Sequence, residues 1–225
     1  MLYIPLSVNL KQQSMARLKS GVFGGFKGKI GNVVGTTWKD LDVIRSVPAK
    51  KEKPATPKQL QQQQRFALMG KVMQGMNELL SVTFRSFSSS MSGYNSALKY
   101  NIRNAITGVY PALQIHYPTL LVSRGDLPAA TSASVAMGGE GLLLFSWTDN
   151  TGLGIAKADD WAVLVCYEPE SNICVFDRSS TRRCDNSGLL KVPHFQNKEV
   201  HTWLAFTNTT VTQVANSVYT GVFMV

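Results

Sequence analysis

Two kinds of hydrophobic pattern divide the chain. After a glycine-rich beginning, apolar residues recur at helical spacing up to about residue 111, whereas from Leu113 onward they alternate with period two in short runs. The short runs predict strands at residues 114–122, 132–137, 142–148, 162–167, 173–177, 189–192, 200–207 and 217–225. This spacing is typical of an immunoglobulin-like or fibronectin-like antiparallel β-sandwich, with Trp147 and Trp203 as core residues on facing sheets.

The helical part is predicted to begin at Pro57. Thr56 suits the N-cap, and proline fits the first helical position, where its missing N–H is not needed. One apolar stripe then continues through Phe66, Met69, Val72, Met73, Met76, Leu79, Leu80 and Thr83. A second helix is indicated by Tyr94, Leu98, Ile102, Ala105, Ile106 and Val109, ending at Gly108 or Pro111. Two such antiparallel helices could bury their stripes on each other and cover one face of an N-terminal hairpin.

The N-terminal region is predicted to form that hairpin. Six of the 18 glycines lie within residues 21–35, a density that excludes a helix there. β-branched residues indicate strands at 30–38 and 41–47, and residues 48–57 read as a basic, proline-punctuated linker. The expected fold class is therefore α+β: an extension (1–14) ahead of a possible second start at Met15, a basic hairpin-plus-helices module (15–111), and the sandwich (112–225).

Charge separates the two halves of the chain. The net charge is +9, yet residues 1–110 hold 16 Lys or Arg against 4 Asp or Glu, while residues 111–225 hold 7 against 10. Such asymmetry indicates that the halves meet different partners or meet each other, for example in head-to-tail contacts between copies.

The candidate chemistry is that of a binding protein rather than an enzyme. The glycine stretch fails the Walker pattern because Gly24 and Gly28-Lys29 are separated by three residues and Ile30 follows. His116, His194 and His201 form no metal-binding pair, and acids such as Asp159-Asp160 and Glu168-Pro169-Glu170 read as solvated turn residues. We therefore expect no catalytic residues, no metal and no cofactor.

The cysteines and the ends of the hydrophobic runs bear on location. Three cysteines without an export signal favour a reducing compartment, with Cys166 as a buried small hydrophobe. No run is apolar enough to span a membrane and no secretion signal is recognised, so a cytoplasmic or virion-associated location is expected.

A basic surface is the remaining candidate site. Its glycines at 24, 25, 28, 31 and 35 leave room for a bent strand to pass close to a neighbour, and its cations suggest a negatively charged one. The predicted polyanion-binding or partner-binding residues are Arg17, Lys19, Lys27, Lys29, Trp38, Lys39, Arg45, Lys50, Lys51 and Lys53. Since no recognition-helix motif is present, binding of nucleic acid would involve backbone phosphates.

Several stretches also resemble a known family. They include Gly24-Gly-Phe-Lys-Gly-Lys-Ile-Gly-Asn-Val-Val-Gly35, Val43-Ile-Arg-Ser-Val-Pro-Ala-Lys50, Leu121-Val-Ser-Arg-Gly-Asp-Leu127, Phe145-Ser-Trp-Thr-Asp-Asn150 and Asn216-Ser-Val-Tyr219. The chain is similar in these to an uncharacterised protein family of Bacteroidetes bacteria, and this resemblance implies no activity. The basic stretch before Thr56-Pro57-Lys58-Gln59 also resembles segments of phage-type structural proteins.

These observations lead to a non-enzymatic structural or interaction protein, self-assembling or phage-like. The alternative is a non-specific nucleic-acid-binding protein that uses the basic N-terminal module. A carbohydrate-binding sandwich is a third hypothesis, which would need exposed aromatic residues in the C-terminal loops.

Overall fold

The computed structural model describes residues 17–18, 25–38, 41–47, 54–85 and 91–225. Its contacts divide the chain into two compact units, Met1–Pro54 and Ala55–Val225. The predicted boundary after residue 111 instead separated the helices from the sandwich. The structure groups them together because helices and strands share one hydrophobic core.

Four strands form the sheet of the first unit, called the N-terminal sheet below. They are β1 (Arg17–Leu18), β2 (Phe26–Ile30), β3 (Val33–Trp38) and β4 (Leu41–Ser46), paired antiparallel in chain order. Ile30 was expected to begin the strand that ends at Trp38, but it ends β2. Gly31, with φ +55°, turns the chain there, a conformation that glycine adopts without steric cost.

The second unit begins with helix α1 (Pro57–Gly75), whose predicted start is confirmed. The Thr56 hydroxyl accepts a hydrogen bond from the Gln59 N–H, and the Gln59 side chain accepts one from the Thr56 N–H. The predicted single helix is divided, since α2 (Asn77–Thr83) begins after a break at Met76. Gly75 lies directly against Asn172, where a Cβ would clash.

Helix α3 (Gly93–Asn104) ends earlier than predicted. Ile106 and Val109 were assigned to this helix, but Ile106 belongs to β5 (Ile106–Thr107), which pairs with β6 (Gln114–Ile115). Gly108, with φ +87°, lies in the connection between these strands, a backbone conformation that a helix cannot continue through.

The predicted strand at 114–122 is mostly not a strand. After β6, a 3₁₀ turn η2 (Tyr117–Thr119) follows, and the next residues are held by side chains instead of a ladder. The Asn101 side chain bonds both the N–H and the C=O of Leu121, and the Trp203 indole N–H donates to the Leu120 carbonyl at 3.0 Å. These bonds satisfy buried backbone groups that would otherwise require a neighbouring strand.

Seven further strands form the predicted sandwich. One sheet has the order β10-β9-β12-β13 and the other β11-β8-β7, and all pairs are antiparallel. The bounds are β7 Thr131–Gly139, β8 Leu142–Thr148, β9 Trp161–Glu168, β10 Ile173–Asp177, β11 Ser187–Lys191, β12 Glu199–Thr207 and β13 Val218–Met224. Two packed antiparallel sheets of three and four strands are the architecture of immunoglobulin-like and fibronectin-like sandwiches.

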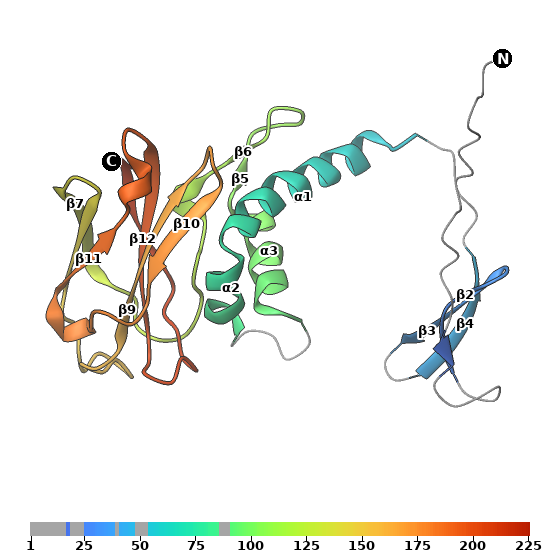
Figure 1. Ribbon diagram of the computed structural model, residues 1–225, viewed down its shortest axis with the longest axis horizontal. Coiled ribbons are helices and arrows are strands. Elements are labelled where there is room, and N and C mark those ends of the chain that lie inside the picture. The colour runs from blue at the N-terminus through green and yellow to red at the C-terminus, as the bar shows by residue number, and fades with distance from the viewer. Residues whose placement is uncertain (1–16, 19–24, 39–40, 48–53, 86–90) are drawn as a thin grey trace, which may run out of the picture. The chain divides into compact units, whose positions relative to one another are not determined.

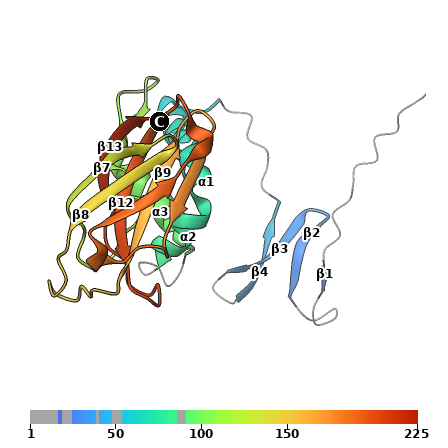
Figure 2. The same ribbon diagram turned by 60° about the vertical axis from the view of Figure 1, so that its left-hand side comes forward.

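The unit has three layers, because α1, α2 and α3, called the helical layer below, cover the outer face of the four-stranded sheet (Figure 1). Strands β9 and β12 consequently contact a core on both faces, and every residue from 162 to 168 and from 200 to 207 is buried. Leu164 and Leu204 point between the sheets, whereas Val165 and Trp203 point to the helices. The view of Figure 2 shows the strands of the sandwich with the helices on one side.

The two expected core tryptophans are both buried and lie on different sheets, but only one lies between the sheets. Trp147 of β8 belongs to the inner sandwich core. Trp203 of β12 belongs to the core that includes Met69 and Met73 of α1 and Phe84, the residue that follows α2. The expectation of two core tryptophans on facing sheets is therefore confirmed, and period two along β12 places Trp203 on the helical side of its sheet.

Candidate functional site

Two of the predicted basic residues lie on one face of the N-terminal sheet. The register pairs Lys29 with Val34, and Val34 with Arg45, so these three residues form one row across β2, β3 and β4. Trp38 follows Val34 by four positions on β3, which places it on the same face. This face therefore combines two cations with an aromatic ring that is 62% exposed.

The other predicted site residues are placed less completely. The register sets Arg17 opposite Lys27, on the part of β2 that pairs with β1. Five residues lie outside the described part of the chain: Lys19, Lys39, Lys50, Lys51 and Lys53. The structure thus brings together Lys29, Trp38 and Arg45 from the predicted set.

The glycines of this unit do allow a close approach, but the neighbour belongs to the same sheet. A Cβ on Gly35 would overlap the main-chain carbonyl and the ring of Phe26. Gly28 has φ +122° and is the β2 residue that the register pairs with Gly35. The expected close contact is therefore between strands, and it gives no indication of a bound anion.

Apolar side chains are exposed throughout the described part of the N-terminal sheet. Within residues 25–38 and 41–47, Gly35 alone is buried. Trp38, Leu41 and Ile44 are 62%, 63% and 65% exposed, and Ile30 is 48% exposed. The described strands of this unit thus leave most of their apolar side chains in contact with solvent, although burial of such side chains is the main term that offsets conformational entropy on folding.

A second basic surface lies on the helical layer, and sequence reasoning did not find it. Two adjoining hollows of ≈ 480 and ≈ 410 Å³, together called the basic groove, share Lys99 and Arg103 of α3. The first also includes Arg65, Gln61 and Gln62 of α1, and the second includes Arg124. A sequence signal existed, since residues 54–125 contain seven Lys or Arg and one acid, Glu78.

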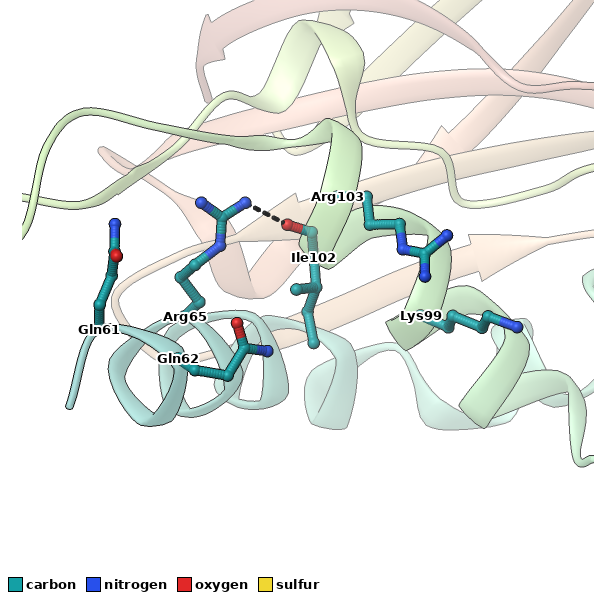
Figure 3. Close-up of a pocket in the computed structure, with 6 residues that line it drawn as sticks. All are labelled: Gln61, Gln62, Arg65, Lys99, Ile102 and Arg103. Atoms are coloured by element: carbon teal, nitrogen blue, oxygen red, sulfur yellow. Dashed lines mark hydrogen bonds between the residues drawn. The ribbon is translucent and has the colours of Figure 1, made fainter. Parts of the chain in front are cut away.

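The cations of the basic groove are held in different ways. Arg65 of α1 donates from Nη2 to the Ile102 carbonyl of α3 at 2.7 Å, which fixes its guanidinium between the helices (Figure 3). Lys99 and Arg103 extend in the same direction from successive turns of α3. The Arg124 guanidinium lies over the Tyr100 ring, 4.6 Å from its centroid.

Three charged residues that looked unremarkable in the sequence are buried. Asp160 and Glu168 were expected to be solvated turn acids, but each is 1% exposed, and Arg183 is fully buried. Arg183 Nε lies 3.1 Å from Asp160 Oδ2, and its guanidinium also bonds Asn150 Oδ1 and the Pro128 carbonyl. Burial lowers the pKa of Arg183, which the nearby Asp160 carboxylate opposes. Because it is buried and bonds these partners, the pair of Arg183 and Asp160 has a structural role, and it is called the buried ion pair below.

Glu168 is likewise paired. Burial acts to raise its pKa, but hydrogen bonds from the Ser171 hydroxyl and N–H, the Lys198 ammonium and the Glu170 N–H outweigh burial and lower the pKa to about 2. A carboxylate with that many donors stays ionised and does not exchange protons near neutral pH.

The three histidines have separate surroundings. His201 of β12 stacks on Tyr117 with ring centroids 3.7 Å apart, and its Nδ1 lies 2.9 Å from the Tyr219 hydroxyl. Burial lowers the pKa of His201, although Glu199 partly opposes this. His116 contacts Thr119, and His194 lies exposed on the 3₁₀ turn η4 (Pro193–Phe195).

Metal and thiol chemistry can be judged over the same described ranges. No group of three or more His, Cys, Asp or Glu side chains among them is placed to hold a metal ion. Cys166 is buried as expected, and burial raises the pKa of its thiol; the Cys174 thiol has its pKa raised to about 12, also by burial. Within those ranges, no helix is long and apolar enough to cross a membrane.

Comparisons with known proteins bear on the family and the sandwich. Residues 25–221 match the model of a family described as a family of unknown function (DUF6266). The match carries no information about organism, so the Bacteroidetes attribution stays a prediction. A comparison with curated proteins gave no match.

Similar solved structures include fibronectin type III domains. The FN1–FN3 domains of chicken CNTN1 are 13% identical with a TM-score of 0.35, covering 45% of this chain and 32% of that one. A structure described as a myokine is 10% identical with a TM-score of 0.34, covering 44% and 97%. The fn3 domain of the human collagen alpha-1(XX) chain is 10% identical with a TM-score of 0.32, covering 45% and 88%.

Proposed function

Because this chain belongs to a family of unknown function (DUF6266), we propose a role from its own surfaces: it is a non-enzymatic interaction protein that associates with further copies of itself through the N-terminal sheet. The observation that carries this proposal is the exposure of Trp38, Leu41 and Val43, which the register places on one face of a sheet whose described part has one buried residue. Clustered exposed apolar side chains mark surfaces that another surface covers.

Charge favours a second copy as the partner. The first 110 residues carry 16 cations and 4 acids, while the rest of the chain carries 7 cations and 10 acids. The N-terminal sheet of one copy, with Lys29 and Arg45 on one face, is thus complementary in sign to the C-terminal half of another. Repetition of such a heterologous contact gives a ring or a filament.

The test is the mass of the full chain in solution, measured by light scattering over a range of concentrations. We expect a mass above the 24.7 kDa of one chain, and a return to monomer in Leu41→Asp. The matched control is Val109→Asp, because Val109 is 80% exposed and lies in the second unit but outside the acidic half of the chain. A wild-type monomer at every concentration, or equal loss of association in both variants, would refute the proposal.

Salt separates the two contributions to this contact. Apolar burial persists at high ionic strength, whereas attraction between exposed charges is screened within about 10 Å at 0.1 M. Association that survives 1 M salt supports the apolar contact, and association that vanishes there assigns the contact to charge alone. A phage-like particle and a virion-associated location are the more specific forms of this proposal.

A second candidate function rests on the row of Lys29 and Arg45 with Trp38 on the same face. Cations beside an exposed aromatic ring are the elements of non-specific binding to single-stranded nucleic acid. If this function holds, Lys29→Gln/Arg45→Gln weakens retention on DNA or RNA. If retention is unchanged in that variant, this face is not the binding site.

A further inference from the structure

The basic groove of the helical layer is a separate binding site, and we propose that it takes the phosphodiester backbone of a nucleic-acid strand. It lies in the second unit and uses none of the residues of the N-terminal sheet. The proposal is therefore independent of self-association, and either can fail alone.

The charge of the groove points to an anionic ligand. Among the described residues that line the two hollows are four cations, Arg65, Lys99, Arg103 and Arg124, and no acid. Glu78, the acid of residues 54–125, acts on the buried thiol of Cys174 and is absent from both linings. The described lining therefore carries a net positive charge, which attracts an anionic ligand.

The type of cation favours phosphate. Three of the four are arginines, whose planar guanidinium matches the oxygens of phosphate with two parallel hydrogen bonds. Gln61, Gln62 and Asn104 add amide groups that donate to phosphate and sugar oxygens. Carboxylates would also suit arginine, so an acidic protein is the competing ligand that the experiment has to exclude.

The shape of the groove favours an extended ligand over a single phosphate. The hollows adjoin through Lys99 and Arg103, which are four residues and about 6 Å apart along α3. The second hollow also includes Tyr100 and the Arg124 guanidinium, which lies 4.6 Å from the centroid of the Tyr100 ring; aromatic rings and guanidinium planes are surfaces on which bases stack. Successive phosphates of one strand can therefore contact successive cations.

Hydrogen bonds within the helical layer hold the elements that carry this site in position. Arg65 is positioned by the Ile102 carbonyl, and α3 is fixed by Asn101, which is fully buried and bonds Leu121. Lys99 and Arg103 themselves are exposed. Their neutralisation should consequently change binding without unfolding the helical layer.

The experiment measures fluorescence anisotropy of a labelled mixed-sequence 20-nucleotide single strand, titrated with the full chain at several salt concentrations. Four phosphate contacts predict a loss of affinity of about 50-fold between 50 and 200 mM salt. Lys99→Gln/Arg103→Gln removes two contacts, so it should bind more weakly and lose only about 7-fold over that range. The control Arg178→Gln/Lys191→Gln makes the same charge change at exposed positions of the sandwich and should behave as the wild type.

Three results of direct binding would overturn the proposal, and further ones come from competition. These are no binding at 50 mM salt, an equal effect of both double variants, or a loss of binding in Lys29→Gln/Arg45→Gln alone. Competition identifies the ligand class. Inorganic pyrophosphate that competes at the same concentration as the strand would indicate a site for a small phosphate, and poly-glutamate that does so would indicate a site for an acidic protein. Either result contradicts a site for a nucleic-acid strand. A hairpin duplex of the same sequence that binds more tightly than the single strand would also contradict it.

Discussion

Removing the buried guanidinium of Arg183 should destabilise the second unit strongly. The Arg183→Met variant leaves the Asp160 carboxylate, 1% exposed, with a hydrogen bond from the Lys157 N–H at 2.9 Å. It also removes the donors to Asn150 Oδ1 and the Pro128 carbonyl. Breaking a buried ion pair from one side costs about 3–5 kcal/mol, a large part of the 5–15 kcal/mol that stabilises a typical domain.

A double variant tests whether Arg183 and Asp160 stabilise the fold as a pair. Asp160→Asn alone leaves a buried guanidinium without its counter-charge, so it should also cost about 3–5 kcal/mol. In Arg183→Met/Asp160→Asn no charge is left buried, and the remaining cost is that of unpaired oxygens, about 1–3 kcal/mol. The two single costs therefore must not add.

Urea unfolding followed by tryptophan fluorescence and by circular dichroism measures these differences. Trp147, Trp161 and Trp203 all lie in the second unit, so fluorescence mainly reports that unit, and coincidence of the two signals checks for a single transition. The stabilising role of the buried ion pair would be refuted by single variants that lower the free energy of unfolding by less than about 1 kcal/mol. A double variant that lowers it by the sum of the two single effects would also refute it.

Three further predictions test the layers, the acid pH limit and the glycines. Trp203→Ala, which empties the core between the helical layer and β12, should cost about 3–5 kcal/mol of unfolding free energy in urea, and a cost below 1 kcal/mol would contradict that packing. Glu168 has its pKa lowered from 4.5 to about 2, so its stabilisation is present above pH 4.5 and is lost as pH falls toward 2; thermal unfolding of Glu168→Gln should show a smaller loss across that window, and identical losses would contradict it. Gly35→Ala should destabilise the N-terminal sheet by about 1–3 kcal/mol through overlap with Phe26, as followed by the part of the tryptophan fluorescence change that a matched Trp38→Phe variant lacks. Gly70→Ala, with open space around its Cβ, should be neutral or stabilising.

The sequence predicts those elements whose signals are local. Strands β8 and β10 have the predicted bounds, since turn residues flank each run. The start of α1 at Pro57 is also confirmed, because its capping box consists of residues three apart. Such features need no knowledge of the rest of the chain.

Features that depend on distant residues were mispredicted or missed. The end of α3 is set by pairing of Ile106 with Ile115, and the segment after β6 is held by Asn101 and Trp203. Asp160 is buried because of Arg183, 23 residues away. The spacing of residues along the chain does not reveal these partners, because they are distant in sequence.

The candidate site shows the same limit. The cations concentrated within residues 15–53 predicted a binding surface there, and five of the predicted residues fall outside the described part. The basic groove was missed because Arg65, Lys99 and Arg124 are far apart in sequence. Packing of α1 against α3 brings Arg65 near Lys99, and Arg124 joins them by its contact with Tyr100 of α3. A count of acids over residues 54–125 would have indicated it.

The double burial of β9 and β12 restricts how this protein can meet others. An antiparallel sandwich commonly offers the outer face of a sheet to solvent, and hence to a partner. Here the chain's own helices already occupy that face of the four-stranded sheet, with Trp203 and Val165 against them. A second molecule that approaches from this side therefore meets glutamine, lysine and arginine side chains of α1 and α3, so the helices give the sandwich a new outer surface whose chemistry is independent of the strands beneath.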